Sequence, residues 1–227
     1  MLKAEIIATG SKGNAVLLGG CVLIDCGVPL KKLEPYIPAL RCVLITHRHG
    51  DHLKLPTLKA ITERRPGLTV ICPEDCTALI REACPLSQVL PAVPGHALCL
   101  LGQSGPSVPY EPDIFARAFA VPHDVPCLAY WLRVGCDTVF YATDCKDLYG
   151  VEPPRAELYL IEANYADADL QARTSAALDR GSASHERRVR ETHMSREDAM
   201  QWLMEHAPTT AQIILLHQHH EEEEKPE

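Results

Sequence analysis

The sequence contains no apolar run that is long enough to cross a bilayer. Its longest apolar segments, such as AVLLGGCVLI, are short and interrupted by glycine, whereas a membrane-spanning helix needs about 20 apolar residues. The first residues, MLKAEIIATGSKGN, also lack the apolar core and the small-residue cleavage site of a secretory signal. We therefore expect a cytoplasmic protein that has no membrane partner.

Cysteine is not scarce, but the spacings that would give it a special role are missing. The ten cysteines include no C-x-x-C pair and no repeating spacing, and most lie in apolar runs such as GCVLIDC. In a reducing cytosol such residues are usually small buried hydrophobic side chains. We therefore expect reduced thiols in the core rather than a disulfide framework.

The excess of positive charge that is typical of avid, nonspecific nucleic-acid binding is also missing, because the formal net charge is −8. Arginine is nevertheless concentrated at residues 171–196, which hold six arginines against three acidic residues. This segment is either a solvated helix face or a patch that faces phosphate groups. Charge alone favours the first interpretation.

Short apolar segments that run into turn residues predict strands at residues 4–10, 14–20, 21–27, 41–46, 67–73, 114–123, 127–135, 137–144, 156–164 and 211–216. Apolar spacing predicts helices at 55–65, 74–84 and 167–181, the last ended by Gly181. Ser195, with Asp198 three residues later, predicts a capped helix over 195–207. Residues 29–40 form a short helical or irregular connection, and the Pro/Gly-rich residues 101–113 form a loop.

No internal repeat is visible, and no linker divides the chain into two cores. Strands and helices are interspersed from end to end. We therefore expect one α/β domain at residues 1–220, followed by an acidic, disordered tail at residues 221–227.

Three histidines and a carboxylate follow the predicted strand at residues 41–46. They are His47, His49, Asp51 and His52, and imidazole and carboxylate are preferred ligands of Zn²⁺ and related divalent metals. In an extended segment the first two point to the same side, whereas the adjacent Asp51 and His52 can point to different places. The alternative is a chance surface tract, but α/β proteins build sites where strands end. We expect a metal site that can serve two ions.

Three further apolar strands each end in a potential ligand, namely His123, Asp144 and His217. Each one alone is equally well explained as a capping or surface residue. A pair of catalytic metals needs about six or seven protein groups. Together with the first cluster, these strand ends predict one shared site.

The H-x-H-x-D-H pattern at residues 47–52, followed in order by His123, Asp144 and His217, resembles the signature of the metallo-β-lactamase-fold hydrolases. The segment LIDCG, with Asp25, matches the first strand motif of that family, where the aspartate supports the metal loop. The resemblance covers nearly the whole chain. It implies an α/β fold, a four-layer αββα sandwich of two mixed sheets flanked by helices.

Several shorter segments are similar to the YycJ (WalJ)-type group of exonucleases, which is related to RNase J and the β-CASP nucleases. These segments are GSKGN (10–14), VPHD (121–124), YATD (141–144), LIEAN (160–164) and THMSREDAMQWL (192–203). In that branch a histidine precedes a helix and a strand that ends in another histidine, which here are His193 and His217. The sequence departs from the group at Tyr165, where the relatives often have histidine.

The resemblance implies a role for each of the ligands. His47, His49 and His123 would hold the first metal, Asp51, His52 and His217 the second, and Asp144 would bridge them. The two ions would be divalent, with Zn²⁺ as the first choice and Mn²⁺ as the alternative. The nucleophile would be water or hydroxide between the metals. His219 and His220 are alternatives to His217, which we prefer because it follows the apolar strand directly.

The resemblance also implies catalytic and substrate-binding residues. Asp51 is positioned to take a proton, and His193 is the general acid or a donor to a phosphate oxygen. Ser11, Lys12 and Asn14, in a loop flanked by glycines, would contact phosphate. The alternative for this loop is a tight hairpin turn.

These features lead to two enzymatic hypotheses and one that is not enzymatic. The first is a dinuclear, metal-dependent hydrolase of phosphodiester bonds, a 5′ to 3′ exonuclease with DNA as its partner. The second is a small-molecule metallohydrolase that acts on a cyclic nucleotide, thioester or lactone. The third is a metal-binding interaction module. A chain of 227 residues leaves no room for an inserted β-CASP domain, so nucleic acid would be held shallowly or by an oligomer such as a homodimer.

Overall fold

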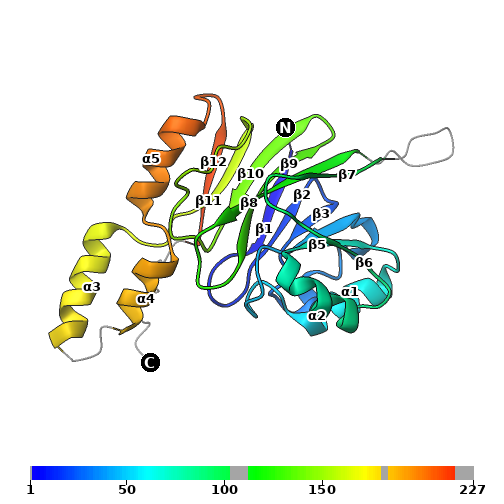
Figure 1. Cartoon of the computed structure of the whole chain (residues 1–227), viewed down its shortest axis with the longest axis horizontal. Coiled ribbons are helices and arrows are strands. Elements are labelled where there is room, and N and C mark those ends of the chain that lie inside the picture. Colours follow the sequence, from blue (N-terminus) through cyan, green and yellow to red (C-terminus); the bar gives the residue numbers. More distant parts are fainter. Residues whose placement is uncertain (1, 103–111, 180–183, 218–227) are drawn as a thin grey trace.

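Two mixed β-sheets of six strands each form the centre of the molecule (Figure 1). The structure is a computed structural model and describes residues 2–102, 112–179 and 184–217. The first sheet has the order β1-β2-β3-β4-β5-β6, and its strands are Ala4–Ala8, Ala15–Leu18, Val22–Ile24, Cys42–Leu44, Thr69–Cys72 and Gln88–Pro91. The second has the order β12-β11-β10-β9-β8-β7. From β7 to β12 its strands are Ala97–Leu100, Ile114–Val121, Cys127–Val134, Asp137–Ala142, Leu158–Glu162 and Gln212–Leu216.

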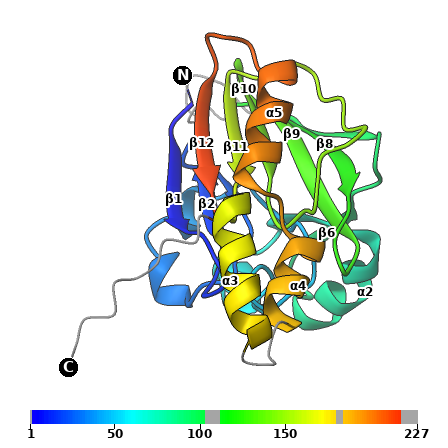
Figure 2. The same ribbon diagram turned by 90° about the vertical axis from the view of Figure 1, so that its left-hand side faces the viewer.

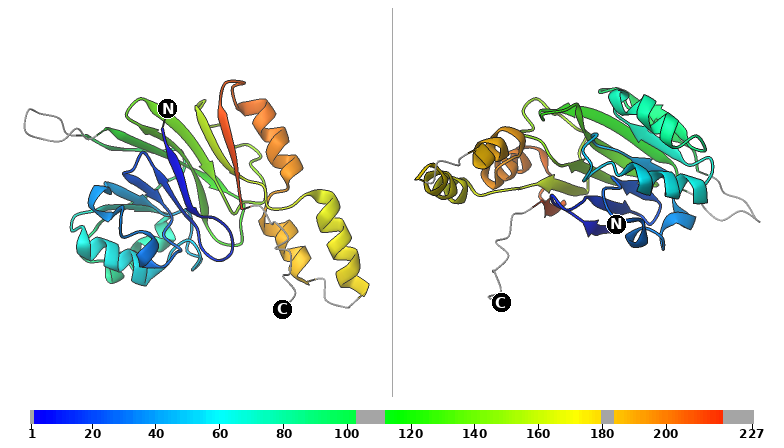
Figure 3. Two further views of the ribbon diagram at one scale, coloured as in Figure 1. Left: turned by 180° about the vertical axis from the view of Figure 1, so that it is seen from behind. Right: turned by 90° about the horizontal axis from the view of Figure 1, so that it is seen from below.

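Helices cover the outer faces of both sheets (Figures 1 and 2). Helices α1 (Leu55–Arg64) and α2 (Glu74–Ala83) pack on the first sheet, together with the short 3₁₀ helices η1 (Leu30–Lys32) and η2 (Ile37–Ala39). Helix α5 (Arg196–His206) packs on the second sheet. Helices α3 (Asp167–Asp179) and α4 (Ser184–Thr192) form a hairpin that projects from the body of the molecule (Figure 3).

Three apolar layers account for this arrangement. One lies between the sheets, where Leu44 and Ile71 meet Tyr130 and Leu160. The second lies under α1 and α2, and the third lies under α5, where the Trp202 ring stacks on Phe140 at 5.2 Å. The α/β fold of two mixed sheets between helices is therefore confirmed.

One edge of the sandwich collects the carboxyl ends of strands from both sheets. In the first sheet β3 and β4 run parallel. In the second, β9 is antiparallel to both β8 and β10, while β10, β11 and β12 run parallel to one another. Strands β8, β10, β11 and β12 therefore all end at the same edge, and residues that follow strands far apart in the sequence meet there.

Two strands and one helix were not predicted from the sequence. Strands β6 and β7 are only four residues long and lie on either side of a Pro-Gly turn, so no clear alternation marks them. Helix α4 has one apolar residue, Val189, which is buried, so no apolar periodicity indicates it. The capped helix was predicted correctly, because the Asp198 N–H donates to Ser195 Oγ at 3.0 Å.

The cysteines form no disulfide, although all ten lie in the described part of the chain, and eight of them are buried. None of the helices that the structure describes has the length and apolar character needed to span a membrane. Gly181 and the tail expected at residues 221–227 lie outside the described residues.

Candidate active site

The loop that follows β4 is held from below by Asp25, at the end of β3. The Thr46 N–H donates to Asp25 Oδ1 at 2.8 Å, and the His52 Nδ1–H donates to Oδ2 at 2.7 Å. Asp25 is fully buried, and burial raises the pKa of its carboxyl, although the neighbouring His52 opposes that rise. Because Nδ1 of His52 is fixed in this way, its Nε2 faces the centre of the site.

Close backbone packing locks the same loop in place. The carbonyl of Asp51 accepts from the Asn14 N–H at 2.7 Å, and the carbonyl of His52 accepts from the Cys26 N–H at 2.8 Å. Gly27 lies so close that a Cβ on it would come within 1.7 Å of the Asp51 carbonyl oxygen. The loops at residues 10–14 and 25–27 therefore set the position of the metal loop.

Three histidines bring their ring nitrogens together at the first predicted metal position. His47 Nε2 lies 3.0 Å from His49 Nδ1, and His123 Nε2 lies 3.4 Å from the same atom. The His123 Nδ1–H donates to the Thr192 carbonyl at 3.1 Å, which leaves its Nε2 lone pair free. Burial lowers the pKa of His47 to about 2 and also lowers the pKa of His123. Neutral imidazoles in this arrangement fit a divalent cation with an open position.

Asp144 lies at the centre, between the first histidine group and the other ligands. Its Oδ2 is 3.7 Å from His47 Nε2 and 2.6 Å from His52 Nε2, and its Oδ1 accepts from the His217 Nδ1–H at 2.7 Å. Burial alone raises the pKa of Asp144, but the charge of His52 and the hydrogen bonds from His217 and His52 hold it well below the usual value. An ionised carboxylate between two groups of donors is the geometry that a bridging ligand needs.

The remaining predicted metal ligand, Asp51, occupies a looser position. Its side chain is 29% exposed, and its Oδ2 lies 3.8 Å from His52 Nε2. Within the described residues the compact donor groups are His47-His49-His123, His47-His52-Asp144 and Asp144-Glu162-His193-His217, and none of them includes Asp51. Asp51 instead lines the cavity, where it is accessible to a substrate or a water molecule.

Sequence reasoning missed Glu162, the last residue of β11. Its Oε1 accepts from the His193 Nδ1–H at 2.5 Å and its Oε2 accepts from the Cys145 N–H at 2.9 Å. Burial lowers the pKa of His193, but the hydrogen bond and charge of Glu162 outweigh that effect and raise it. A signal was present, because Glu162 ends an apolar strand just as Asp144 follows one.

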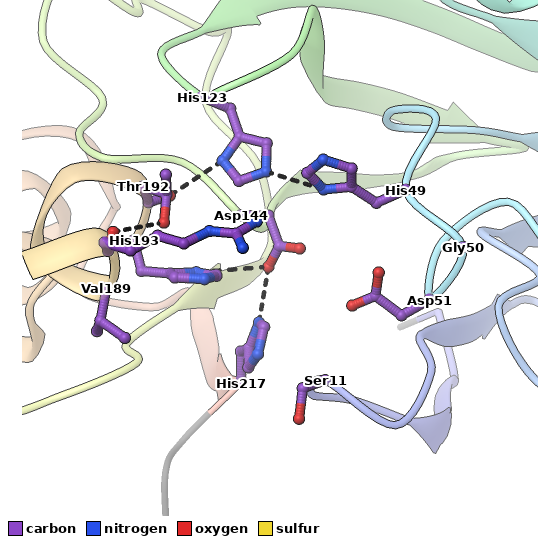
Figure 4. A pocket seen from close by; sticks show the side chains of 11 residues that line it. Ser11, His49, Gly50, Asp51, His123, Asp144, Val189, Thr192, His193 and His217 are labelled. Atoms are coloured by element: carbon purple, nitrogen blue, oxygen red, sulfur yellow. Dashed lines mark hydrogen bonds and ion pairs between the residues drawn. The ribbon is translucent and has the colours of Figure 1, made fainter. Parts of the chain in front are cut away.

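A cavity of about 410 Å³ opens over these residues (Figure 4). Ser11 lines it from one side, and Arg188 and His193 line it from the side of α4. Lys12 is exposed but is not among the lining residues. Asn14 is 1% exposed, and its side chain bonds to the backbone of Gly10 and lies 2.7 Å from His52 Nε2. Of the three predicted phosphate contacts, the structure brings only Ser11 to the cavity.

The arginine-rich segment contributes one of its arginines, Arg188, to this cavity. Arg188 Nη2 lies 3.3 Å from Asp124 Oδ2, while Asp124 Oδ1 lies 3.3 Å from His49 Nε2. Nearby, Tyr165 is buried against Leu170 and Val189. Tyr165 therefore packs against the α3–α4 hairpin.

Three non-glycine residues of the described chain have a left-handed backbone, and all three belong to this site. They are Asp25, Asp144 and His217, with φ angles of 59°, 50° and 52°. Such conformations cost about 1–3 kcal/mol each and persist only where the surroundings impose them. Asp25 and His217 follow a strand directly, and Asp144 follows one after a single residue, so the turn at each strand end aims the side chain into the site.

The sequence matches the family described as Beta-lactamase superfamily domain over residues 21–218. No curated protein has a significant sequence match to the chain. Among solved structures, the metallo-beta-lactamase fold protein YhfI from Bacillus subtilis is 21% identical, with a TM-score of 0.68 over 96% of this chain and 86% of that one. Human tRNase Z, short form (ELAC1), is 17% identical, with a TM-score of 0.66 over 95% and 92%. Zn²⁺-bound PqqB from Methylobacterium extorquens is 12% identical, with a TM-score of 0.63 over 96% and 89%. Identities this low establish a shared fold.

Proposed function

The chain belongs to the beta-lactamase superfamily, and on that premise we propose that it is a metal-dependent hydrolase of phosphodiester bonds in nucleic acid. The observation that carries the proposal is the His193–Glu162 pair. His193 lines the same cavity as His49 of the metal loop (Figure 4), and the buried Glu162 accepts from its Nδ1–H. This arrangement places a proton donor opposite a site for divalent cations, which is what cleavage of an alkyl phosphodiester requires.

The donor atoms fit two divalent cations. His47, His49 and His123 would hold one, and Asp144 would link it to a second near His52 and His217. When bound, the cations neutralise phosphate charge and make water nucleophilic near neutral pH. Nitrogen and oxygen donors suit both Zn²⁺ and Mn²⁺, and the name of the PqqB relative, which specifies Zn²⁺, supports zinc.

His193 supplies the proton that the leaving oxygen needs. Its Nδ1–H is held by Glu162, so the opposite ring nitrogen, Nε2, is the atom that can donate to a leaving alkoxide. The buried carboxylate of Glu162 stabilises the imidazolium form, which keeps the proton available. Asp51, on the other side of the cavity, is placed to accept a proton from the attacking water.

Positive charge and a hydroxyl are available for the phosphate. Arg188 reaches the cavity from α4, and Ser11 reaches it from the loop at residues 10–14. Within the described residues Arg188 is paired only with the exposed carboxylate of Asp124, at 3.3 Å, a contact that a phosphate can replace at little cost. Lys12, in the same exposed loop as Ser11, would contact a more distant phosphate.

We infer that the substrate is DNA and that cleavage runs from the 5′ end. The support for DNA and for this direction is the resemblance of five segments to the YycJ-type exonucleases. The name of the human relative, which specifies a tRNA nuclease, supports nucleic acid as the substrate class. A decisive experiment uses chelator-treated protein with 5′- and 3′-labelled single-stranded DNA, duplex DNA and RNA. Zn²⁺ or Mn²⁺ should restore cleavage, with mononucleotides released from the 5′ end of DNA first. Turnover of a cyclic nucleotide, thioester or lactone, with no cleavage of any nucleic acid, would replace the proposal.

A further inference from the structure

Part of the outer face of the second sheet is left open beside α5 (Figure 2). Helix α5 covers β10 and β11, and Leu148 and Val151 cover the ends of β8 and β9 that lie near the site. Over the other end of these two strands, the described part of the chain places no helix. The side chains that point outward there are Phe115, Arg117 and Phe119 of β8 and Trp131 and Arg133 of β9, which we call the Arg–aromatic face.

These five residues alternate along their strands with core residues such as Ala116, Ala118 and Leu132, so they lie on the outer face of the sheet. Phe119 and Trp131 pack in part against the apolar layer under α5, and the Trp131 Nε1–H donates to the Arg155 carbonyl at 3.4 Å. All five are partly exposed. The chain has only three phenylalanines and two tryptophans, and three of these five rings lie on this face. Such a concentration of rings on the uncovered part of a sheet marks an interaction surface.

Rings and guanidinium groups alternate across the two strands. Phe115 lies opposite Arg133, and Arg117 lies opposite Trp131. The Arg133 guanidinium carbon is 4.0 Å from the centre of the Phe115 ring, and that of Arg117 is 5.3 Å from the centre of Phe119. Each guanidinium therefore lies within cation–π range of a ring on the same face.

Neither guanidinium has an anionic partner within the described residues. The side chains of Arg117 and Arg133 form no hydrogen bond or ion pair there, and Nε of Arg117 is buried without an acceptor. Glu157 approaches this face, but its carboxylate accepts from the N–H of Thr138, opposite Arg133 in the sheet. The Nη groups of both arginines are therefore available to an anionic ligand.

The ligand must offer anionic oxygens and flat rings at repeated intervals. Single-stranded nucleic acid offers both, because its phosphates bind arginine and its unpaired bases stack on aromatic rings. A duplex hides its base faces, and an acidic peptide has charge without rings. We propose that the Arg–aromatic face binds single-stranded nucleic acid. That the bound nucleic acid is a substrate of the nearby cavity rests on the proposed function.

Strand β8 runs from this face towards the site. The strand ends at Val121, two residues before His123 at the metal site. At about 3.3 Å per residue, Phe119 lies roughly 13 Å and Phe115 roughly 26 Å from His123 along the chain. Strand β8 therefore connects this face to the edge of the sandwich that carries the cavity.

Trp131 reports directly on occupancy of the face. The only other tryptophan, Trp202, is buried and stacked on His206. A phosphorothioate single strand, which resists cleavage, should quench the emission of the wild-type protein and leave that of Trp131→Phe nearly unchanged. Both proteins should bind the strand with affinities within about two-fold, measured by anisotropy, because phenylalanine still stacks. Quenching that survives Trp131→Phe would overturn the proposal.

Charge removal gives a second test with a matched control. Arg117→Gln with Arg133→Gln should weaken binding of the single strand about ten-fold and reduce the slope of log K against log salt by about 1.4. Lys31→Gln with Lys32→Gln removes two exposed charges from η1, on the other sheet, and should change neither quantity. Circular dichroism shows whether each variant is folded. Equal losses in the two double variants would overturn the proposal.

The same assays distinguish single-stranded nucleic acid from other ligands, and they test the face separately from the proposed hydrolytic function. Equal quenching by the matched duplex or by polyglutamate would assign the face to another partner and reject single-stranded nucleic acid. Hydrolysis of bis(p-nitrophenyl) phosphate by the wild-type protein reports the metal site alone. Hydrolysis without quenching of Trp131 rejects only the face, whereas quenching without any hydrolysis keeps the face and rejects the proposed activity.

Discussion

His193 donates its Nδ1–H to Oε1 of Glu162 over 2.5 Å, and the glutamate that receives it is completely buried. This pair joins the end of β11 to the residue that follows α4. Since it lies beside Asp144 rather than among the three histidines of the first metal position, it can be altered without removing those ligands.

His193→Ala should lower kcat on DNA by about 10²–10⁴-fold, because a leaving alkoxide then has no proton donor. The rate with a p-nitrophenyl ester should change by less than about ten-fold, because that leaving group needs little protonation. His96→Ala, an exposed histidine far along the chain from the site residues, serves as the control. The two rates and the metal content of both variants test this assignment. A variant that has lost metal would show that His193 is a ligand.

Glu162→Gln should lower kcat on DNA by about 10–100-fold, with metal content and KM unchanged. The neutral amide no longer stabilises the imidazolium of His193, and its NH₂ group faces either His193 or the Cys145 N–H, where a second acceptor is needed. Steady-state kinetics on DNA and on the p-nitrophenyl ester measure the effect. Equal losses on both substrates would contradict a role in protonating the leaving group.

Asp144→Asn should remove most of the bound metal, because the charge that joins the two groups of donors is lost. Asparagine tolerates the left-handed backbone of this residue, so the change tests the ligand without adding backbone strain. Metal content per protein should fall, while Asp147→Asn, in the exposed loop that follows, keeps its metal. Full metal occupancy in Asp144→Asn would reject the bridging role.

Gly27→Ala should destabilise the fold by about 3 kcal/mol or more, because the new Cβ would overlap the Asp51 carbonyl. Movement of that carbonyl also displaces His52, so metal affinity should fall with stability. Gly50 lies in the metal loop beside Asp51, and a Cβ on it would meet nothing within 4 Å. Gly50→Ala should therefore change the free energy of unfolding by less than about 1 kcal/mol. Urea denaturation compares the two. Equal stability of both variants would show that the loop relaxes around the added methyl group.

The fold and most of the site could be predicted because their signals are local. His47, His49 and His52 lie within one short segment, and His123 and His217 each follow an apolar run. A residue at a strand end is visible in the sequence, and parallel strands bring such ends to one edge.

The remaining features depend on contacts between distant segments. Nothing near Glu162 in the sequence reveals that His193 lies 2.5 Å away. Asn14 has a side chain suited to phosphate, but it is buried because the loop at residues 10–14 folds against the metal loop. Arg188 reaches the cavity on a helix that has no apolar periodicity. That Arg117 lies opposite Trp131 could be predicted only if the register of β8 and β9 were known.

The left-handed backbone at Asp25, Asp144 and His217 limits which substitutions these positions tolerate, in design and in evolution. Glycine and asparagine are tolerated there, whereas valine, isoleucine and threonine would force the strand end to take another path. A change of metal preference is therefore accessible through a few side chains that leave the chain path intact. A change of the backbone path at a strand end would instead redirect every side chain that follows that strand. Single ligands can therefore be exchanged at this edge while the β-sandwich stays the same.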